Sequence, residues 1–252
     1  MLSDRQVVEP FHLQFIRLLG SGPDKDRFAI KGGCNLRFFF ESIRYSEDID
    51  IDVVRTPVHT LKEKVSRILE GPALVLPLTS RGISVGKVSA PKQTDTTRRW
   101  KVGLAAEGRS LPLHTKIEFS RRSTMEEAKV EAIAASVLAD YQLMPQLARH
   151  YPLAAALRQK IGALTGRSTV QARDVFDLAV LLAKAGGETD ALRPVRAQVP
   201  KAIERAMDVS FADFKSQVVS YLKPEHVDEY ARREAWDALQ GQVVAQLEKV
   251  LS

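Results

Sequence analysis

The chain of 252 residues has little cysteine and no long apolar run. Cys34 is the single cysteine, which excludes an internal disulfide and a cysteine-built zinc site and favours a reducing compartment. The longest apolar run, Leu178–Ala183, is far shorter than the roughly 20 residues of a membrane span. Asp4 and Glu9 interrupt the apolar pattern of the opening segment, unlike the core of a signal peptide. We therefore expect a cytoplasmic protein with no membrane partner.

Several catalytic motifs are also missing. The five histidines show no metal-ligand spacing, and there is no H-E-x-x-H motif. The sequence contains neither a Walker phosphate loop nor a Gly-x-Ser-x-Gly elbow. These absences exclude the common zinc-peptidase, P-loop and serine-hydrolase sites.

The overall composition is that of an ordinary globular protein. Charged residues make up 27% of the chain and hydrophobic residues 44%. With 252 residues, the chain is long enough for one large domain or two small ones. The formal net charge of +6 is compatible with a polyanionic partner but does not identify one.

The most informative stretch pairs a double glycine with an acidic strand. Lys31-Gly32-Gly33 follows a short apolar run, and Asp48–Val54 then alternates acidic and aliphatic residues. In a strand, residues at i and i+2 share a face, so these carboxylates would line up about 7 Å apart. A divalent cation removes the repulsion between such carboxylates, and a glycine turn offers backbone N–H groups to phosphate. The pattern therefore indicates a site for a nucleoside triphosphate.

A simpler interpretation is an edge strand with one solvated acidic face and one buried aliphatic face. The double glycine upstream, together with Arg37, Arg44 and Ser46 between the two motifs, favours the nucleotide site.

Two blocks of sequence stand out. The first reads K-G-G-C-N-L-R and then R-Y-S-E-D-I-D-I-D, and the second spans Leu157–Leu164, Arg167 and Arg173–Leu178. Together they resemble the AbiEii/AbiGii family of nucleotidyltransferase toxins, which includes the mycobacterial MenT enzymes. The resemblance covers roughly residues 25 to 185. It implies a DNA polymerase β-like nucleotidyltransferase core.

The resemblance implies a role for several carboxylates. Asp48 and Asp50 would bridge two Mg²⁺ ions, with Mn²⁺ as the alternative, and so act as metal ligands and catalytic residues. Glu118, on a later alternating strand, resembles the third carboxylate of such sites. It could equally be a surface residue paired with Lys116 or Arg121. Asp52 is an additional acid that could be a solvated strand end.

Other residues are assigned to the nucleotide. Gly32, Gly33, Ser46 and Arg37 would bind its phosphates, because glycine lets the backbone approach closely and serine adds a hydroxyl. Lys160 interrupts an apolar helical stripe, which indicates either a side chain that reaches solvent or a lysine held near a fixed anion such as triphosphate.

A second helix contains two more acids. Asp174 matches a family position tied to activity and is assigned to orienting Lys160 or the nucleotide. Asp177 is assigned to structure, with an i, i+4 pair to Arg173 as one option.

The expected fold is mixed α/β, with a nucleotidyltransferase subdomain over residues 1–145 and a helical subdomain over residues 146–252 that completes the nucleotide cleft. We expect helices before Gly20, at 35–42 with Asn35 as N-cap, and at 59–69. Strands are expected at 27–30, 48–54, 73–78, 82–88, 99–104 and 113–120, with a loop or hairpin tip at 91–98. Residues 126–141 are compatible with either helix or strand. Further helices are expected at 152–165, 170–185, 191–206, 210–222 and 225–250.

The leading functional hypothesis is an enzyme that transfers NMP from an NTP to an acceptor and releases pyrophosphate. By analogy with the family, the acceptor would be the 3′ end of tRNA and the enzyme a toxin paired with a cognate antitoxin. The alternatives are the same chemistry on a small molecule or protein, and a non-catalytic nucleotide- or RNA-binding module.

Overall fold

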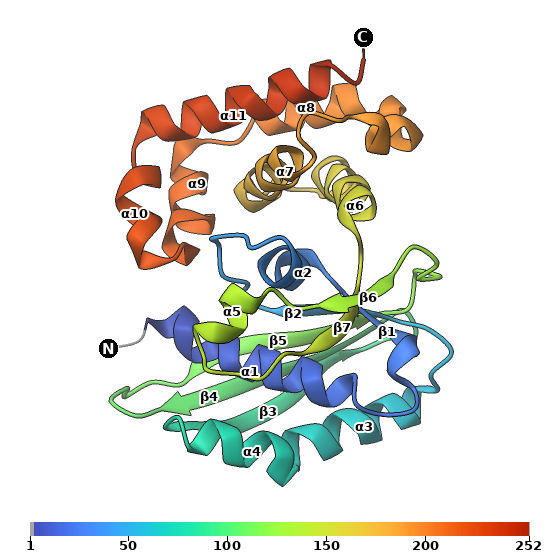
Figure 1. Ribbon diagram of the computed structural model, residues 1–252, viewed down its shortest axis with the longest axis vertical. Helices are drawn as coiled ribbons and strands as arrows, with labels where there is room; N and C mark the ends of the chain where they lie inside the picture. The colour runs from blue at the N-terminus through green and yellow to red at the C-terminus, as the bar shows by residue number, and fades with distance from the viewer. Residues whose placement is uncertain (1–2, 252) are drawn as a thin grey trace. The chain divides into compact units, whose positions relative to one another are not determined.

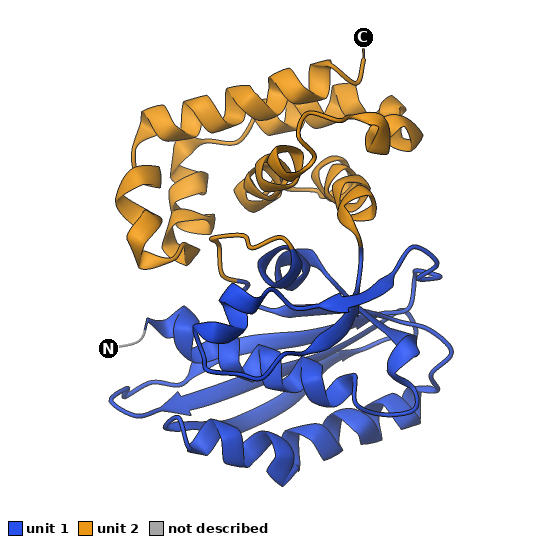
Figure 2. Ribbon diagram, in the orientation of Figure 1, with its two compact units in different colours: residues 1–39, 46–151 blue, residues 40–45, 152–252 orange. Residues whose placement is uncertain are grey.

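The computed structural model describes residues 3–251 and divides the chain into two compact units (Figures 1 and 2). The first unit contains residues 1–39 and 46–151, and the second contains residues 40–45 and 152–252. Residues 1, 2 and 252, the outer ends of the expected subdomains, lie outside the described part. Among residues 3–251, no helix combines the length and hydropathy that a bilayer crossing requires.

The first unit is built on one mixed sheet of seven strands in the order β3-β4-β5-β2-β1-β7-β6. The strands are β1 Phe28–Lys31, β2 Ile49–Val53, β3 Ile83–Gln93, β4 Thr97–Ala106, β5 Leu113–Ser120, β6 Lys129–Ala132 and β7 Leu147–His150. The accompanying helices are α1 Asp4–Leu19, the short η1 Lys25–Arg27, α2 Gly32–Phe39, α3 Val58–Glu70, α4 Pro72–Thr79 and α5 Ala135–Ala139. β2 pairs antiparallel with β1 and parallel with β5, which places it at the centre of the sheet. The mixed α/β class expected from the sequence is confirmed.

The central strands alternate as their sequences predict. Ile49, Ile51 and Val53 of β2 are buried, and so are Ile117 and Phe119 of β5. These side chains belong to the apolar core that includes residues of α1, α3 and α4. Asp50 and Glu118, which are register partners, lie on the other face of the same strands.

One predicted strand is a helix. Residues 73–78 lie in α4, which begins with Pro72 at its first turn, a position that suits the fixed φ of proline. Leu74 and Leu78, four residues apart, are fully buried, whereas Leu76 is 67% exposed. A short apolar run does not distinguish a strand from a helix, but the spacing of the buried leucines is helical.

The helix after the double glycine begins earlier than expected. Gly32 and Gly33 form the first turn of α2, so the prediction of Asn35 as N-cap is wrong. Asn35 is buried inside the helix, where its amide donates to the carbonyl of Tyr151 at 2.9 Å. β3 and β4 also extend into the region predicted as a loop, leaving only residues 94–96 between them. Residues 126–141 contain both β6 and α5.

The second unit is helical. Its elements are α6 Leu153–Gly166, α7 Ala172–Lys184, η2 Asp190–Gln198, α8 Val199–Met207, α9 Phe211–Gln217, η3 Val219–Tyr221, α10 Pro224–Tyr230 and α11 Arg233–Glu248. α6 packs on α7, and α11 packs on both α7 and α8. Phe214 stacks on Trp236 with ring centroids 4.5 Å apart, and both rings are buried.

The segment 40–45 joins this helical unit although it is far from it in sequence. Arg44 forms an isolated antiparallel bridge with Leu222. Tyr45 N donates to Tyr221 O at 2.8 Å, and Lys223 N donates to Ile43 O at 2.9 Å. Two strand-like hydrogen bonds therefore hold this segment against the turn that precedes α10.

Candidate functional site

The first part of the site is the close approach of Gly32 to Asp50. Gly32 has φ of +63°, a conformation that residues with a side chain rarely adopt. A Cβ at this position would lie 2.7 Å from Asp50 Oδ2. Glycine is therefore required twice, once by the backbone angle and once by the carboxylate beside it.

The N-terminus of α2 begins at this glycine. The first turn of a helix leaves backbone N–H groups without intrahelical partners, and its partial positive charge attracts anions. Gly32 and Gly33 provide two of these N–H groups with no side chain between them and a ligand. This helix end suits a phosphate group, as the sequence predicts. The Asp50 carboxylate lies beside the same helix end, next to Gly32.

Asp48 is held just before β2. Ser46 Oγ donates to the carbonyl of Asp48 at 2.8 Å, so in this structure the Ser46 hydroxyl shapes the turn. The Asp48 carboxylate accepts from Lys116 N at 2.9 Å and lies 2.7 Å from Lys116 Nζ. Burial raises the pKa of Asp48, while Lys116 opposes this change. Lys116 supplies the positive charge beside this partly buried carboxylate.

Buried polar side chains hold the turn at Glu47 and Asp48 in place. Thr115 Oγ1 donates to Glu47 O at 2.9 Å, so His12 Nε2, at 2.7 Å, must donate to Thr115. Burial lowers the pKa of His12 to about 3, and the ring is therefore neutral. The thiol of Cys34, whose pKa burial raises, donates to Asp48 O at 3.3 Å. Three side chains from α1, α2 and β5 thus fix the backbone that presents Asp48.

Glu118 lies on β5 directly beside Asp50 in the register of the sheet. Its carboxylate is paired with Arg99 of β4, with Nη2 2.5 Å from Oε2. The alternative pairing with Lys116 or Arg121 does not occur, because Lys116 contacts Asp48 and Arg121 donates to Thr56 O.

Two other residues have structural surroundings that the sequence did not indicate. Asp52 is buried rather than solvated, 2.5 Å from Lys31 Nζ and bonded to the Tyr151 hydroxyl at 2.6 Å. Arg37 is 2% exposed, and its guanidinium donates twice to the buried carboxylate of Glu9. This pairing engages the guanidinium inside the protein, so we no longer assign Arg37 to the nucleotide.

Asp48 and Asp50 are the residues that fit a divalent cation. Within residues 3–251, no group of three or more His, Cys, Asp or Glu side chains is arranged to hold a metal. Mg²⁺ is commonly held by one or two carboxylates, with water and phosphate oxygens as its other ligands. Two aspartates are enough in number for such a site, but Asp48 would first have to leave Lys116, just as Glu118 would have to leave Arg99.

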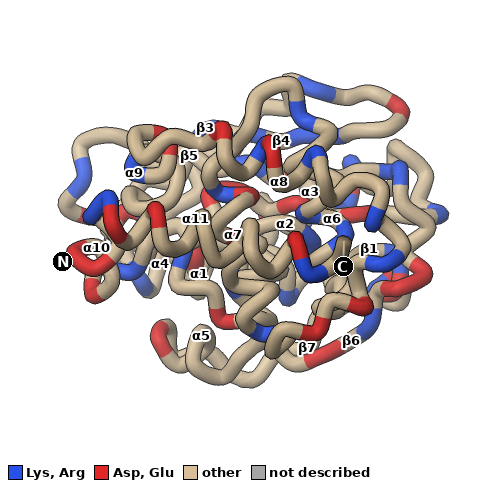
Figure 3. The backbone as a smooth tube through the Cα atoms, turned by 90° about the horizontal axis from the view of Figure 1, so that it is seen from above, with Lys and Arg blue, Asp and Glu red and all other residues tan. Residues whose placement is uncertain are grey.

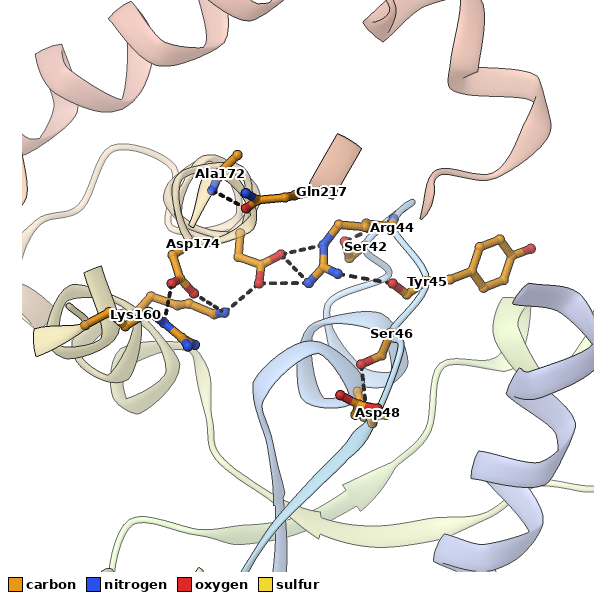
Figure 4. Close-up of polar contacts among 12 residues, drawn as sticks. Ser42, Arg44, Tyr45, Ser46, Asp48, Lys160, Ala172, Asp174 and Gln217 are labelled. Atoms are coloured by element: carbon orange, nitrogen blue, oxygen red, sulfur yellow. Dashed lines mark hydrogen bonds and ion pairs between the residues drawn. The ribbon is translucent and has the colours of Figure 1, made fainter. Parts of the chain in front are cut away.

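In the helical unit, Lys160 lies among buried carboxylates (Figure 4). Its ammonium is 3.1 Å from Asp174 Oδ1 and 2.6 Å from Asp177 Oδ2, and both aspartates are fully buried. Arg167 Nε lies 2.8 Å from Asp174 Oδ2. The fixed anions nearest Lys160 in its own unit are therefore protein side chains. Lys160 and Asp174 are in contact, as their assigned roles require.

Asp177 pairs with Arg44 and not with Arg173. Arg44 donates to both carboxylate oxygens at 3.0 Å and also to the carbonyl of Tyr45 at 3.2 Å (Figure 4). Burial alone would raise the pKa of Asp177, but Arg44 and Lys160 outweigh burial and hold the pKa below its ordinary value. The helix that contains Asp177 can be predicted from the sequence. The partner of Asp177 lies in a loop more than a hundred residues away, which no local pattern reveals.

The cations beside the carboxylates were also missed. Arg99 becomes a neighbour of Glu118 through the pairing of β4 with β5, and Lys116 becomes a neighbour of Asp48 through the pairing of β5 with β2. The signal was present in the alternation of Arg99-x-Lys101 and Lys116-x-Glu118, which predicts charged residues on one face of each strand.

A helix that begins at a double glycine, beside a strand that carries carboxylates in a mixed sheet, is the arrangement expected of a nucleotidyltransferase. The family model described as nucleotidyl transferase AbiEii toxin, type IV TA system, matches residues 17–250. The chain belongs to this family and is a nucleotidyltransferase toxin of the type IV toxin–antitoxin class.

Solved structures show the same fold. JHP933 from Helicobacter pylori is 20% identical, with a TM-score of 0.58 over 99% of this chain and 96% of that one. MenT4, a nucleotidyltransferase toxin from Mycobacterium tuberculosis H37Rv, is 18% identical, with a TM-score of 0.62 over 97% of this chain and 84% of that one. None of the curated proteins matches this chain.

Proposed function

We propose that this enzyme moves NMP from an NTP to the 3′ end of an RNA, with tRNA as the natural acceptor. The acceptor hydroxyl oxygen forms a bond to the α-phosphorus, the bond between this phosphorus and the bridging oxygen breaks, and pyrophosphate leaves. The hydroxyl proton is released. The proposed location is the cytoplasm, where NTPs and RNA are present and the single cysteine stays reduced.

The observation that supports this proposal is the packing of Gly32 against Asp50 with Asp48 beside it. These two carboxylates would hold the divalent cation, with Mg²⁺ proposed. When bound, such an ion supplies charge neutralisation for the triphosphate and lowers the pKa of the acceptor hydroxyl. The backbone N–H groups of Gly32 and Gly33 would bind phosphate oxygens at the helix N-terminus.

The helical unit supplies further proposed nucleotide contacts. Lys160 is proposed to contact phosphate, with Asp174 and Asp177 holding its ammonium in place. Because both aspartates are fully buried, replacing Lys160 should lower stability as well as nucleotide affinity. This expectation differs from that of an isolated lysine on an apolar stripe, whose removal would leave the fold unchanged.

The test is transfer of label from each NTP in turn to total RNA with Mg²⁺. Asp48→Asn and Asp50→Asn should each abolish a labelled RNA band while the melting temperature stays near that of the wild type. Asp95→Asn, an exposed carboxylate at the tip of the β3–β4 hairpin, is the control. Label on a protein or small molecule and on no RNA would reject the acceptor, and activity in Asp48→Asn would reject the carboxylate site.

The antitoxin of this system is a proposed partner. Membership of a type IV toxin family supports the existence of a cognate antitoxin.

A further inference from the structure

The open face of the sheet carries two rows of charge that run across neighbouring strands. In the first row Asp48 contacts Lys116 of β5, whose register partner on β4 is Lys101. In the second row Asp50 is next to Glu118, followed by Arg99 of β4 and Lys92 of β3. Both rows begin with a carboxylate at the β2 end and finish with cations.

The opposite face of the same strands is apolar. Trp100 and Val102 of β4 and Ile117 of β5 are buried, which assigns their alternating neighbours to the open face. Gly103 is the register partner of His114, whose side chain is exposed.

Two pairs of like charge face each other on these strands. Lys101 is opposite Lys116, and Lys92 is opposite Arg99, although like charges directly opposite are destabilising in a sheet. Lys116 and Arg99 are balanced by Asp48 and Glu118. Within residues 3–251, Lys92 and Lys101 have no ion pair, and both are exposed. Their charges remain available to an external anion.

The first row also borders a hollow of about 420 Å³. It is lined by Glu47, Asp48, Arg99, Lys101, His114, Thr115 and Lys116. A ligand in this hollow would therefore touch the carboxylate end and the cations at once. Cations that continue to β3 outside the hollow fit a chain of phosphates better than a single phosphate.

We propose that Lys101 and Lys92, with Lys116 and Arg99, bind the backbone phosphates of a single-stranded RNA acceptor across β5, β4 and β3. The terminal hydroxyl of the RNA lies at the Asp48 end of the rows. This inference rests on the proposed function, since it specifies how the acceptor of that site is held. It adds a binding surface on the sheet that the nucleotide motifs do not include.

The experiment is direct binding of a labelled single-stranded RNA oligonucleotide without NTP, measured by fluorescence anisotropy at several salt concentrations. The test variant is Lys92→Ala with Lys101→Ala. The matched control is Lys25→Ala with Lys62→Ala, which removes the same charge from exposed positions on η1 and α3. For two lost phosphate contacts, the slope of log affinity against log salt should become shallower by about 1.4.

We expect the test variant to bind more weakly than the wild type at low salt, with the shallower salt slope given above, while the control binds as the wild type does. Equal affinity in the test variant and the wild type would overturn the proposal, and so would equal losses in the test and control variants. Failure of the proposed function gives a different result, because the wild type would then transfer no NMP to RNA whatever the binding data show. NMP transfer to a small molecule, with no loss of RNA affinity in the test variant, would overturn both.

Discussion

At the scale of single residues, Gly32 is constrained both by its backbone conformation and by its contact with Asp50. Its positive φ and its contact with Asp50 each exclude a side chain, but for different reasons. The two effects can be separated because the chain offers a glycine with only one of them. Gly108 has φ of +76° and open space where a Cβ would be.

Gly32→Ala should abolish NMP transfer and lower the melting temperature. The alanine must adopt a left-handed backbone, at about 1–2 kcal/mol, and also displace the Asp50 carboxylate. Gly108→Ala should show a similar backbone cost and normal transfer. Parallel thermal unfolding and transfer assays measure both quantities. Normal transfer by Gly32→Ala would contradict the role given to this contact.

His12 predicts how stability depends on pH. Its pKa is lowered to about 3 in the folded state, against 6.5 for an ordinary histidine. The unfolded chain therefore binds a proton between these values and the folded chain does not. Stability should fall as pH decreases from about 6.5 towards 3, by up to about 1.4 kcal/mol per pH unit from this residue.

The measurement is urea unfolding at a series of pH values. His12→Gln should flatten the acid limb of the stability curve, since glutamine does not titrate. His59→Gln, at an exposed histidine on α3, should leave the curve as in the wild type. An unchanged acid limb in His12→Gln would show that other groups determine acid sensitivity.

At the scale of elements, segment 40–45 is joined to α7 by two ion pairs of different kinds. Arg44 and Asp177 are both buried and make three hydrogen bonds. Lys184 lies 3.5 Å from Glu41, and both of these side chains are about half exposed. The same two elements thus provide a buried pair and a surface pair for comparison.

Arg44→Met should destabilise the protein by about 3 kcal/mol, because Asp177 loses its main partner inside the protein. Lys184→Met should cost less than about 1 kcal/mol, since exposed pairs contribute little. Chemical denaturation of the two variants measures the difference. Equal losses would mean that the buried pair does not stabilise this segment more than the surface pair does.

The elements also show what the sequence could predict. β5 has the expected bounds because its alternation is regular, with Thr115, Ile117 and Phe119 at buried positions. α4 was missed because its apolar run is too short to show a period, and only burial distinguishes its two leucines from the exposed one between them. Asp48, Asp50 and the double glycine could be found locally, since their chemistry follows from spacing. The pairing of Lys116, Arg99 and Arg44 could not, because it depends on which strands and loops meet.

At the scale of the whole molecule, acidic positions lie between basic ones along much of the trace (Figure 3). The net charge of +6 is therefore a small excess within a mixed surface. Local rows of cations, rather than the total charge, should decide how a polyanion is bound.

Expression of the toxin in cells should stop growth through the proposed carboxylate site. Asp50→Asn should remove growth arrest, because the carboxylate pair is then incomplete, while Asp95→Asn should arrest growth as the wild type does. Colony counts after induction, with immunoblots for equal protein levels, measure the effect. Full growth arrest by Asp50→Asn would mean that toxicity arises elsewhere in the molecule.

The bridge between residues 43–45 and 221–223 has a consequence for synthesis on the ribosome. The early strand of this bridge leaves the exit tunnel long before its partner is translated. During that interval the buried guanidinium of Arg44 has no site to enter, and the helical unit cannot close around it. Contacts so distant in sequence form late and slowly. The helical unit should therefore fold only after residues 221–223 have left the exit tunnel, and the toxin should be inactive until then.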